Sequence, residues 1–136
     1  MTRLRRYEEF EDESGRTLRY SRTDAGGLVA DDAQVAADAR IADQAWVDPG
    51  ARVGTGAYLG AHCWVEAGAV VGARAHLGAG ARVGQNAVVG AEARLGRGVR
   101  VGAGARVARG VVVPDDVRVP DGAVVRRARG GDGIAA

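Results

Sequence analysis

The stretch Ala69–Gly90, AVVGARAHLGAGARVGQNAVVG, decides the fold, because a bulky aliphatic residue returns at every sixth position. Here these aliphatics are Val71, Leu77, Val83 and Val89, and an alanine stands two residues before each of them. Two inward residues separated by one outward residue have the period of a β-strand. The glycine that usually follows the aliphatic indicates a tight corner. Each hexad therefore predicts one short strand and one turn.

The repeat continues through most of the chain without an insertion. Seventeen aliphatics follow one another at intervals of six residues, from Val29 to Val125. A second period appears in one column, where leucine or isoleucine recurs every eighteen residues at Ile41, Leu59, Leu77 and Leu95, while the other two columns hold valine. Three hexads therefore make one coil, and residues eighteen apart stack at about 4.8 Å, the spacing of strands in a sheet.

The three columns define three faces, which we name by their inward aliphatics. Face A contains Val35, Val53, Val71, Val89, Val107 and Val125; face B contains Ile41, Leu59, Leu77, Leu95 and Val113; face C contains Val29, Val47, Val65, Val83, Val101 and Val119. The sequence thus predicts an all-β protein, a parallel β-helix of about 5–6 three-sided coils. We divide the chain into an N-terminal β-hairpin cap at 1–26, the β-helix at 27–126 and a flexible tail at 127–136.

Both ends of the predicted helix carry features that suit a boundary. Residues 3–22 are typical of a hairpin that turns at Glu13–Gly15, with an acidic arm facing a basic one. Its aromatic residues Tyr7, Phe10 and Tyr20 are expected to cover the first coil. At the other end Pro114 and Pro120 each follow an inward aliphatic, and proline withholds a ladder donor, so the coils should end nearby.

The repeat resembles the hexapeptide-repeat family of acyltransferases, from Gly27 to about Arg126. The resemblance implies a left-handed β-helix, a homotrimer, and acyl-coenzyme A as a cosubstrate, with a histidine as general base. Two departures from the family weigh against catalysis. No loop interrupts the seventeen hexads, although such loops commonly shape the acceptor site, and no C-terminal helix follows the coils.

Two histidines are available for the role of base that the resemblance implies, since imidazole accepts a proton near neutral pH. His62 occupies a corner position that otherwise holds glycine, asparagine or aspartate, and His76 points outward from face B. Each also has a structural explanation: histidine tolerates the left-handed backbone of a corner, and an outward strand residue is simply solvated. We take His62 as the candidate base and His76 as the alternative.

The outward column of face C is the most unusual feature of the sequence, with Trp46, Trp64, Arg82, Arg100 and Arg118 at intervals of eighteen. Stacked arginines repel one another unless an anion or carboxylates lie between them, so this column predicts a site for a phosphate-bearing ligand such as coenzyme A, or for an acidic protein partner. The alternative is that the guanidiniums splay apart in solvent. The two tryptophans form an aromatic surface that could instead pack against the hairpin or another subunit.

Face A presents outward valines at Val70 and Val88 between Arg52 and Arg106. An apolar centre with a charged rim suits a subunit interface, so we assign Val70 and Val88 to the expected homotrimer. The alternative is the strand propensity of valine.

Composition argues against several other classes of function. The net charge of +2 does not favour nucleic acid, and no stretch approaches the length of a membrane span. Met1–Phe10 is charged where a signal peptide is apolar, and the single Cys63 is expected to be an inert buried thiol, so a cytoplasmic location follows. We expect no metal, since two histidines cannot supply a three-histidine zinc site.

Two functions remain open from the sequence. The first is an acyltransferase-like enzyme that moves an acyl group from coenzyme A to a small acceptor. The second is a non-catalytic β-helix scaffold that assembles with itself or binds a partner, for which an uninterrupted repeat is sufficient.

Overall fold

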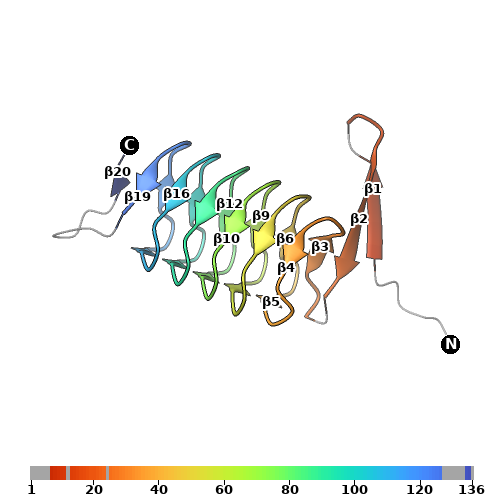
Figure 1. Ribbon diagram of the computed structural model, residues 1–136, viewed down its shortest axis with the longest axis horizontal. Helices are drawn as coiled ribbons and strands as arrows, with labels where there is room; N and C mark the ends of the chain where they lie inside the picture. The colour runs from red at the N-terminus through yellow and green to blue at the C-terminus, as the bar shows by residue number, and fades with distance from the viewer. Residues whose placement is uncertain (1–6, 12, 24, 127–133, 136) are drawn as a thin grey trace.

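The structure, a computed structural model, describes residues 7–11, 13–23, 25–126 and 134–135. It is a β-helix of between five and six coils, with a hairpin at the N-terminal end and a short strand at the C-terminal end (Figure 1). Three parallel sheets form the sides, as the eighteen-residue period predicts. Among the described residues, no helix is long and apolar enough to cross a membrane.

Each side of the prism is one sheet whose strands come from successive coils. Face C has the strands β3 (Leu28–Ala30), β6 (Trp46–Val47), β9 (Trp64–Val65), β12 (Arg82–Val83), β15 (Arg100–Val101) and β18 (Arg118–Val119). Face A has β4 (Gln34–Val35), β7 (Arg52–Val53), β10 (Val70–Val71), β13 (Val88–Val89), β16 (Arg106–Val107) and β19 (Val124–Val125). Face B has β5 (Arg40–Ile41), β8 (Tyr58–Leu59), β11 (His76–Leu77), β14 (Arg94–Leu95) and β17 (Val112–Val113).

The register within every sheet is eighteen residues. Val71, for example, pairs with Val53 on one side and with Val89 on the other. The inward aliphatics and the small residues two positions before them form one continuous core along the axis, and Leu59, Leu77 and Leu95 are its largest fully buried side chains. Because every coil buries the same small set of side chains, stability accumulates by repetition.

Corners between the sheets use residues with a positive φ. Among the described residues, nine glycines of the coils and six other residues have this conformation, and the six are Gln44, His62, Arg74, Asn86, Glu92 and Asp116. A different set of glycines, directly after the inward aliphatics, is required by close packing of the coils. A Cβ added at Gly72 would lie 2.5 Å from the main-chain nitrogen of Ala91. No larger residue fits there without moving the next coil.

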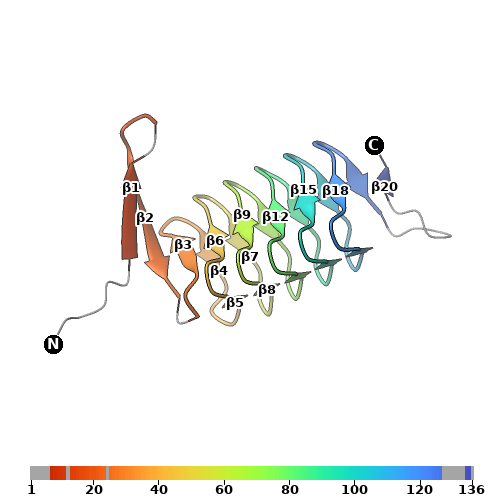
Figure 2. The same cartoon turned by 180° about the vertical axis from the view of Figure 1, so that it is seen from behind.

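The predicted hairpin is confirmed, and it extends face C. Its strands β1 (Tyr7–Glu11) and β2 (Thr17–Arg22) are antiparallel, and β2 pairs with β3 at the edge of face C (Figure 2). The facing charges include Glu9 and Arg19, whose side chains lie 3.9 Å apart. The hairpin stands beyond the first coil as a continuation of one sheet, so β4 and β5 remain end strands of their own sheets.

The C-terminal end of the coils also lies where the prolines predict it. β17 and β18, each followed by proline, are end strands of faces B and C. On face A the end strand β19 pairs with the antiparallel strand β20 (Ile134–Ala135). β20 lies within the segment 127–136 that was predicted to be a flexible tail, and residues 127–133 and 136 of that segment are outside the described part of the chain.

Candidate functional site

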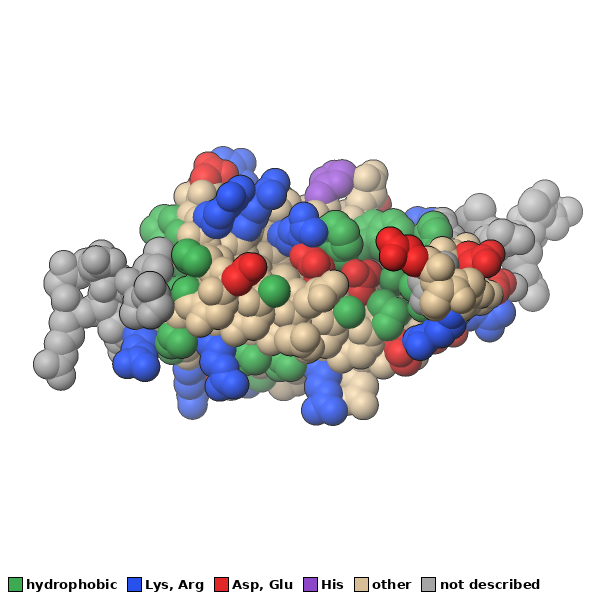
Figure 3. Space-filling model, turned by 90° about the horizontal axis from the view of Figure 1, so that it is seen from above, with side chains coloured by type: hydrophobic (Ala, Val, Ile, Leu, Met, Phe, Trp, Pro, Cys, Tyr) green, Lys and Arg blue, Asp and Glu red, His purple; other side chains and the backbone are tan. Residues whose placement is uncertain are grey.

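The outward column of face C is brought into register by the strand pairing. Trp46 lies beside Trp64, Trp64 beside Arg82, and Arg82 beside Arg100, which in turn pairs with Arg118. The column therefore changes from aromatic to cationic along the axis. On the face of the molecule in Figure 3, arginine side chains gather over the C-terminal coils and most acidic ones lie toward the hairpin.

The three arginines line one groove, which we call the arginine groove. Its volume is about 490 Å³, and it lies where face C turns into face A; the lining residues are Glu66, Arg82, Gly84, Gln85, Arg100, Val101, Gly102, Ala103, Arg118, Val119, Pro120 and Asp121. Arg100 and Arg118 are exposed, and neither forms an ion pair with another described residue. Two neighbouring guanidiniums without carboxylate partners favour an anion at this end of the groove.

Arg82 is held differently from the other two arginines. Its Nε donates a hydrogen bond of 2.6 Å to Glu66, and its guanidinium lies 4.3 Å from the centre of the Trp64 ring. A carboxylate on one side and an aromatic face on another fix the direction of this side chain. Arg82 is therefore the ordered end of the cationic column, and Arg100 and Arg118 are its free end.

Trp64 is itself fixed by a carboxylate that the sequence alone did not single out. Its Nε1 donates to Asp48 at 2.7 Å, and the Tyr20 hydroxyl donates to the other oxygen of Asp48 at 3.0 Å. Burial raises the pKa of Asp48, although these two hydrogen bonds act in the opposite direction. Burial and the neighbouring Asp48 also raise the pKa of Tyr20. The hairpin is thus linked to the arginine groove through Tyr20, Asp48 and Trp64.

An aromatic cluster explains the position of Trp46. The rings of Phe10, Tyr20 and Trp46 lie with their centres 5.3–5.5 Å apart in pairs. Tyr20 is buried in this cluster, whereas Phe10 remains 40% exposed. Trp46 therefore packs against the hairpin, which is one of the two roles expected for the tryptophans. Trp64, also 40% exposed, remains at the surface.

Neither candidate base lines the arginine groove. His62 is exposed at the corner between faces B and C, and its φ is 63°. Its main-chain N–H donates to the carbonyl of Asp43. His76 is exposed on face B, where its ring stacks on Tyr58 at 4.7 Å and its strand pairs with that of Arg94. One chain therefore does not bring a histidine together with the arginine column.

The outward valines predicted at the subunit interface lie side by side. Val70 pairs with Val88, and the column continues to Arg52 on one side and Arg106 on the other. Both valines are only half-buried. Face A therefore has the predicted apolar centre between two charges.

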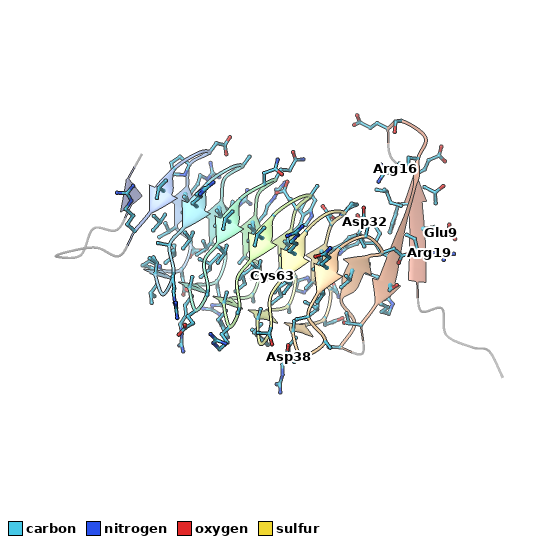
Figure 4. All side chains as sticks on the ribbon, viewed as in Figure 1. Glu9, Arg16, Arg19, Asp32, Asp38 and Cys63 are labelled. Carbon is cyan, nitrogen blue, oxygen red and sulfur yellow. The ribbon has the colours of Figure 1, made fainter. Side chains whose placement is uncertain are left out.

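Cys63 lies among the inward side chains of the coils (Figure 4) and is fully buried. Burial raises the pKa of its thiol to about 11, so little thiolate exists at neutral pH. Within residues 7–11, 13–23, 25–126 and 134–135, no group of three histidine, cysteine or carboxylate side chains is placed to hold a metal ion.

The residues that sequence reasoning missed are the carboxylates beside the column, Asp48 and Glu66. Each carboxylate occupies the corner directly after an inward valine of face C, and its bonded partner, Trp64 or Arg82, lies 16 residues further on. A carboxylate repeated 16 residues before an outward tryptophan or arginine is the signal that could have found them.

Two family models match the coils that carry this site. Residues 56–91 match the bacterial transferase hexapeptide (six repeats), and residues 80–115 match the hexapeptide repeat of succinyl-transferase. Over residues 56–115 the coils are therefore similar to the hexapeptide repeats of bacterial transferases. None of the curated proteins matches its sequence.

Solved structures similar to this hexapeptide-repeat protein include acetyltransferases. A mutant of perosamine N-acetyltransferase from Caulobacter crescentus, in complex with CoA and GDP-perosamine, is 27% identical with a TM-score of 0.53, over 79% of this chain and 55% of the enzyme. A hexapeptide transferase family protein from Anaplasma phagocytophilum is 18% identical with a TM-score of 0.54, over 79% of this chain and 76% of that one, and supports the fold alone. The chain thus spans about half the length of the Caulobacter enzyme.

Proposed function

We propose that this hexapeptide-repeat protein binds an acyl-coenzyme A in the arginine groove and transfers the acyl group to a small acceptor. The observation that carries the proposal is the pair of guanidiniums at Arg100 and Arg118, exposed in a groove and without ion pairs among the described residues. Phosphate groups are strong partners for such a pair. A lone buried thiol suits the cytoplasm, where we place the protein.

The similarity to the Caulobacter enzyme supports the same ligand class. That enzyme is seen with CoA and with GDP-perosamine, and its identity to this chain is 27%. We take coenzyme A from this comparison, because the arginine groove offers the charges that its phosphates need. The acceptor is proposed only as a small amine or alcohol.

The proposed reaction needs a base to remove a proton from the acceptor. The acceptor nitrogen or oxygen attacks the thioester carbonyl, its proton passes to an imidazole, and the coenzyme A thiolate leaves and takes up a proton. We assign the base to His62, with His76 as the alternative. His62 is two residues from Trp64, which contacts the groove residue Arg82.

A homotrimer is part of the proposal, because one chain does not place a histidine in the groove. The arginine groove lies at the corner between faces C and A, and Val70 and Val88 lie on face A. A subunit packed on these valines would stand beside the groove and could bring its own side chains to it. The assembly therefore supplies what the single chain lacks.

The experiment is a thiol-release assay with acetyl-coenzyme A and a panel of small amines and alcohols. We expect turnover that falls by about 100-fold or more in His62→Ala, as removal of a general base predicts, and that is kept in His76→Ala. Loss in His76→Ala with retention in His62→Ala would move the base to His76. Acceptor-dependent turnover kept in both variants would contradict a histidine base.

A non-catalytic scaffold is the second candidate, and one observation favours it. The strands follow one another at intervals of six residues, and no loop interrupts the hexads between β3 and β19. A regular prism of this kind can present a surface without any base. An absence of turnover with every acceptor, in a protein that nevertheless binds another protein through face C, would favour this function.

A further inference from the structure

The ends of the three sheets are treated unequally, and the difference points to a docking site. A strand at the edge of a sheet has unpaired backbone groups, and proteins normally cover or block such edges. In the described part of the chain, each face of the stack of coils begins with one coil strand and ends with another, which gives six strand edges. They can be followed in Figures 1 and 2.

All three C-terminal edges are closed. In the middle of face B the N–H of Gly96 donates to the carbonyl of Val113, and the next residue in that column is Pro114, which has no N–H to donate. Pro120 has the same position on face C, after Gly102 and its bond to Val119. On face A, β20 pairs with β19. A further regular coil at this end would therefore lack a ladder hydrogen bond on faces B and C.

Two of the three N-terminal edges are also closed. On face C the hairpin strand β2 pairs with β3. On face B the loop before β3 approaches the edge, and the Thr23 hydroxyl donates to the carbonyl of Ile41 at 3.1 Å. Neither device reaches face A. Among the described strands that belong to the coils themselves, β4 is the one at an end of the stack that no added strand, proline or side-chain hydrogen bond caps.

The backbone of β4 offers both a donor and an acceptor on its open side. The N–H groups of Gln34 and Ala36 donate to the next coil, at Ala51 and Val53. Alternate backbone groups of a strand point to opposite sides, so the N–H and carbonyl of Val35 point away from the coils. This is the arrangement that an added strand needs.

An apolar hollow lies beside this edge. Its volume is about 640 Å³, and its walls include Val29, Val35, Ala36, Ala39 and Ile41 from the first coil. Val29 and Val35 are only partly buried, whereas their counterparts in the next coil, Val47 and Val53, are buried. The first coil therefore lacks the cover that each later coil receives from its neighbour.

The rim of the open edge is acidic. Asp31, Asp32 and Asp38 occupy the corners on either side of β4, and Figure 4 shows Asp32 and Asp38 at two different corners of the first coil. Hydrogen bonds from the Thr55 hydroxyl and the Gly56 N–H lower the pKa of Asp38, which keeps it ionised. Two copies of this edge facing each other would bring like charges together. Arg40 is the single cation among the residues that line the hollow, so the three aspartates still favour a partner with positive charge.

We propose that β4 is a docking edge for an extended, basic segment of a partner protein, whose apolar side chains fill the hollow and whose cationic side chains meet Asp31, Asp32 and Asp38. The segment adds one strand to face A and closes the sixth edge. Coenzyme A and the arginine groove have no part in this site.

The test uses a fluorescent, end-blocked peptide of sequence Arg-Val-Arg-Val-Arg, with Glu-Val-Glu-Val-Glu as its charge-reversed control. Fluorescence anisotropy should show saturable binding of the basic peptide alone. Asp32→Asn with Asp38→Asn should weaken it by about 5-fold, the value of two exposed ion pairs. Asparagine retains the side-chain oxygen that accepts from Gly50 or Gly56, so the corners stay intact.

The matched control is Asp115→Asn with Asp121→Asn at the other end, where the same side-chain oxygens accept from Arg97 and Ala103. This pair should leave binding unchanged. Val35→Pro, which removes the outward N–H, should abolish binding while a thermal melt shows that the protein is folded. In the wild-type protein, the peptide should slow hydrogen–deuterium exchange of the Val35 amide relative to the protein without peptide.

Equal binding of both peptides, or equal loss in the two pairs of asparagine variants, would overturn the proposal. Light scattering gives the remaining outcome. A dimer that dissociates in Val35→Pro would show that a second copy occupies β4, and this also overturns a basic partner.

Discussion

Asp48 is the residue on which the arrangement of face C depends. Its two oxygens accept from Tyr20 of the hairpin and Trp64 of strand β9, and Trp64 contacts Arg82. The carboxylate is half-buried, so its charge is partly desolvated, and this raises its pKa. A neutral side chain of the same shape would keep the contacts without the buried charge.

We therefore predict different effects for two substitutions of Asp48. Asp48→Ala should lower the free energy of unfolding by roughly 1–3 kcal/mol, because the Tyr20 hydroxyl loses its acceptor. Asp48→Asn should change it by less than about 1 kcal/mol at pH 7, since the amide can bond both partners. Urea denaturation followed by circular dichroism measures both.

The pH dependence of the same pair has a definite sign. The pKa of Asp48 is higher in the folded than in the unfolded protein, so the folded state takes up the proton first as pH falls. Protonated Asp48 therefore stabilises the folded state. This stabilisation is complete below the pKa of about 3.9 in the unfolded protein, and it is lost as the pH rises through the pKa in the folded protein. Wild type should gain stability relative to Asp48→Asn between pH 7 and pH 4. A loss over that range would contradict the raised pKa.

The sequence could predict the columns of face C but not this network. Positions in a column follow from the eighteen-residue period, so Trp64 beside Arg82 was available from spacing alone. The bond from Tyr20 joins residues 28 apart and depends on how the hairpin meets the coils. For the same reason the hairpin was expected to cover the end, whereas it continues one sheet.

At the scale of the element, the glycines of a coil differ in how well they tolerate replacement. Gly72 follows an inward valine and lies against the backbone of the next coil, while Gly80 is a corner residue with a φ of 71° and open space where a Cβ would be. The first is required by packing between coils, and the second by backbone conformation alone.

Alanine at these two positions should therefore have unequal effects. Gly72→Ala should lower the free energy of unfolding by roughly 3 kcal/mol, since main-chain atoms under 3 Å from the new Cβ must move. Gly80→Ala should lower it by about 1 kcal/mol, the penalty of a left-handed conformation. Thermal denaturation of both proteins gives the comparison, and equal losses would mean that the coils can separate easily.

The strands themselves were the most predictable part of the molecule. The inward aliphatics from Ile41 to Val125 all lie in the core, because each position repeats the same environment and one pattern is enforced seventeen times. The ends repeat nothing, so Thr23 at β5 and β20 at β19 were not predicted. The prolines were the exception, because a residue without an N–H cannot donate to a further strand and so predicts where the sheet ends.

At the scale of the whole molecule, face A is where subunits are proposed to meet. Val70 and Val88 are half-buried in the single chain and lie between two arginines. Val88→Arg should convert the proposed trimer into monomers, because it places a charge in the apolar centre. Size-exclusion chromatography with light scattering measures the mass, with Val112→Arg on exposed face B as the control. A trimer that survives Val88→Arg would assemble through another face.

The direction of charge along the axis gives the two ends different chemistry. Acidic corners surround the first coil, and arginines without ion pairs among the described residues line the groove over the last coils. An anionic ligand is therefore attracted to the C-terminal half and a basic segment to the N-terminal end. The two proposed sites lie at opposite ends of one rigid prism.

The most direct test of the proposed ligand is calorimetric titration of coenzyme A into three proteins. These are wild type, Arg100→Ala with Arg118→Ala in the arginine groove, and Arg94→Ala with Arg97→Ala outside it. We predict saturable binding to wild type and to the outside pair, and an affinity lower by about 10-fold or more in the groove pair, as loss of charged hydrogen bonds implies. Equal affinity in all three proteins, or no binding to wild type, would contradict it.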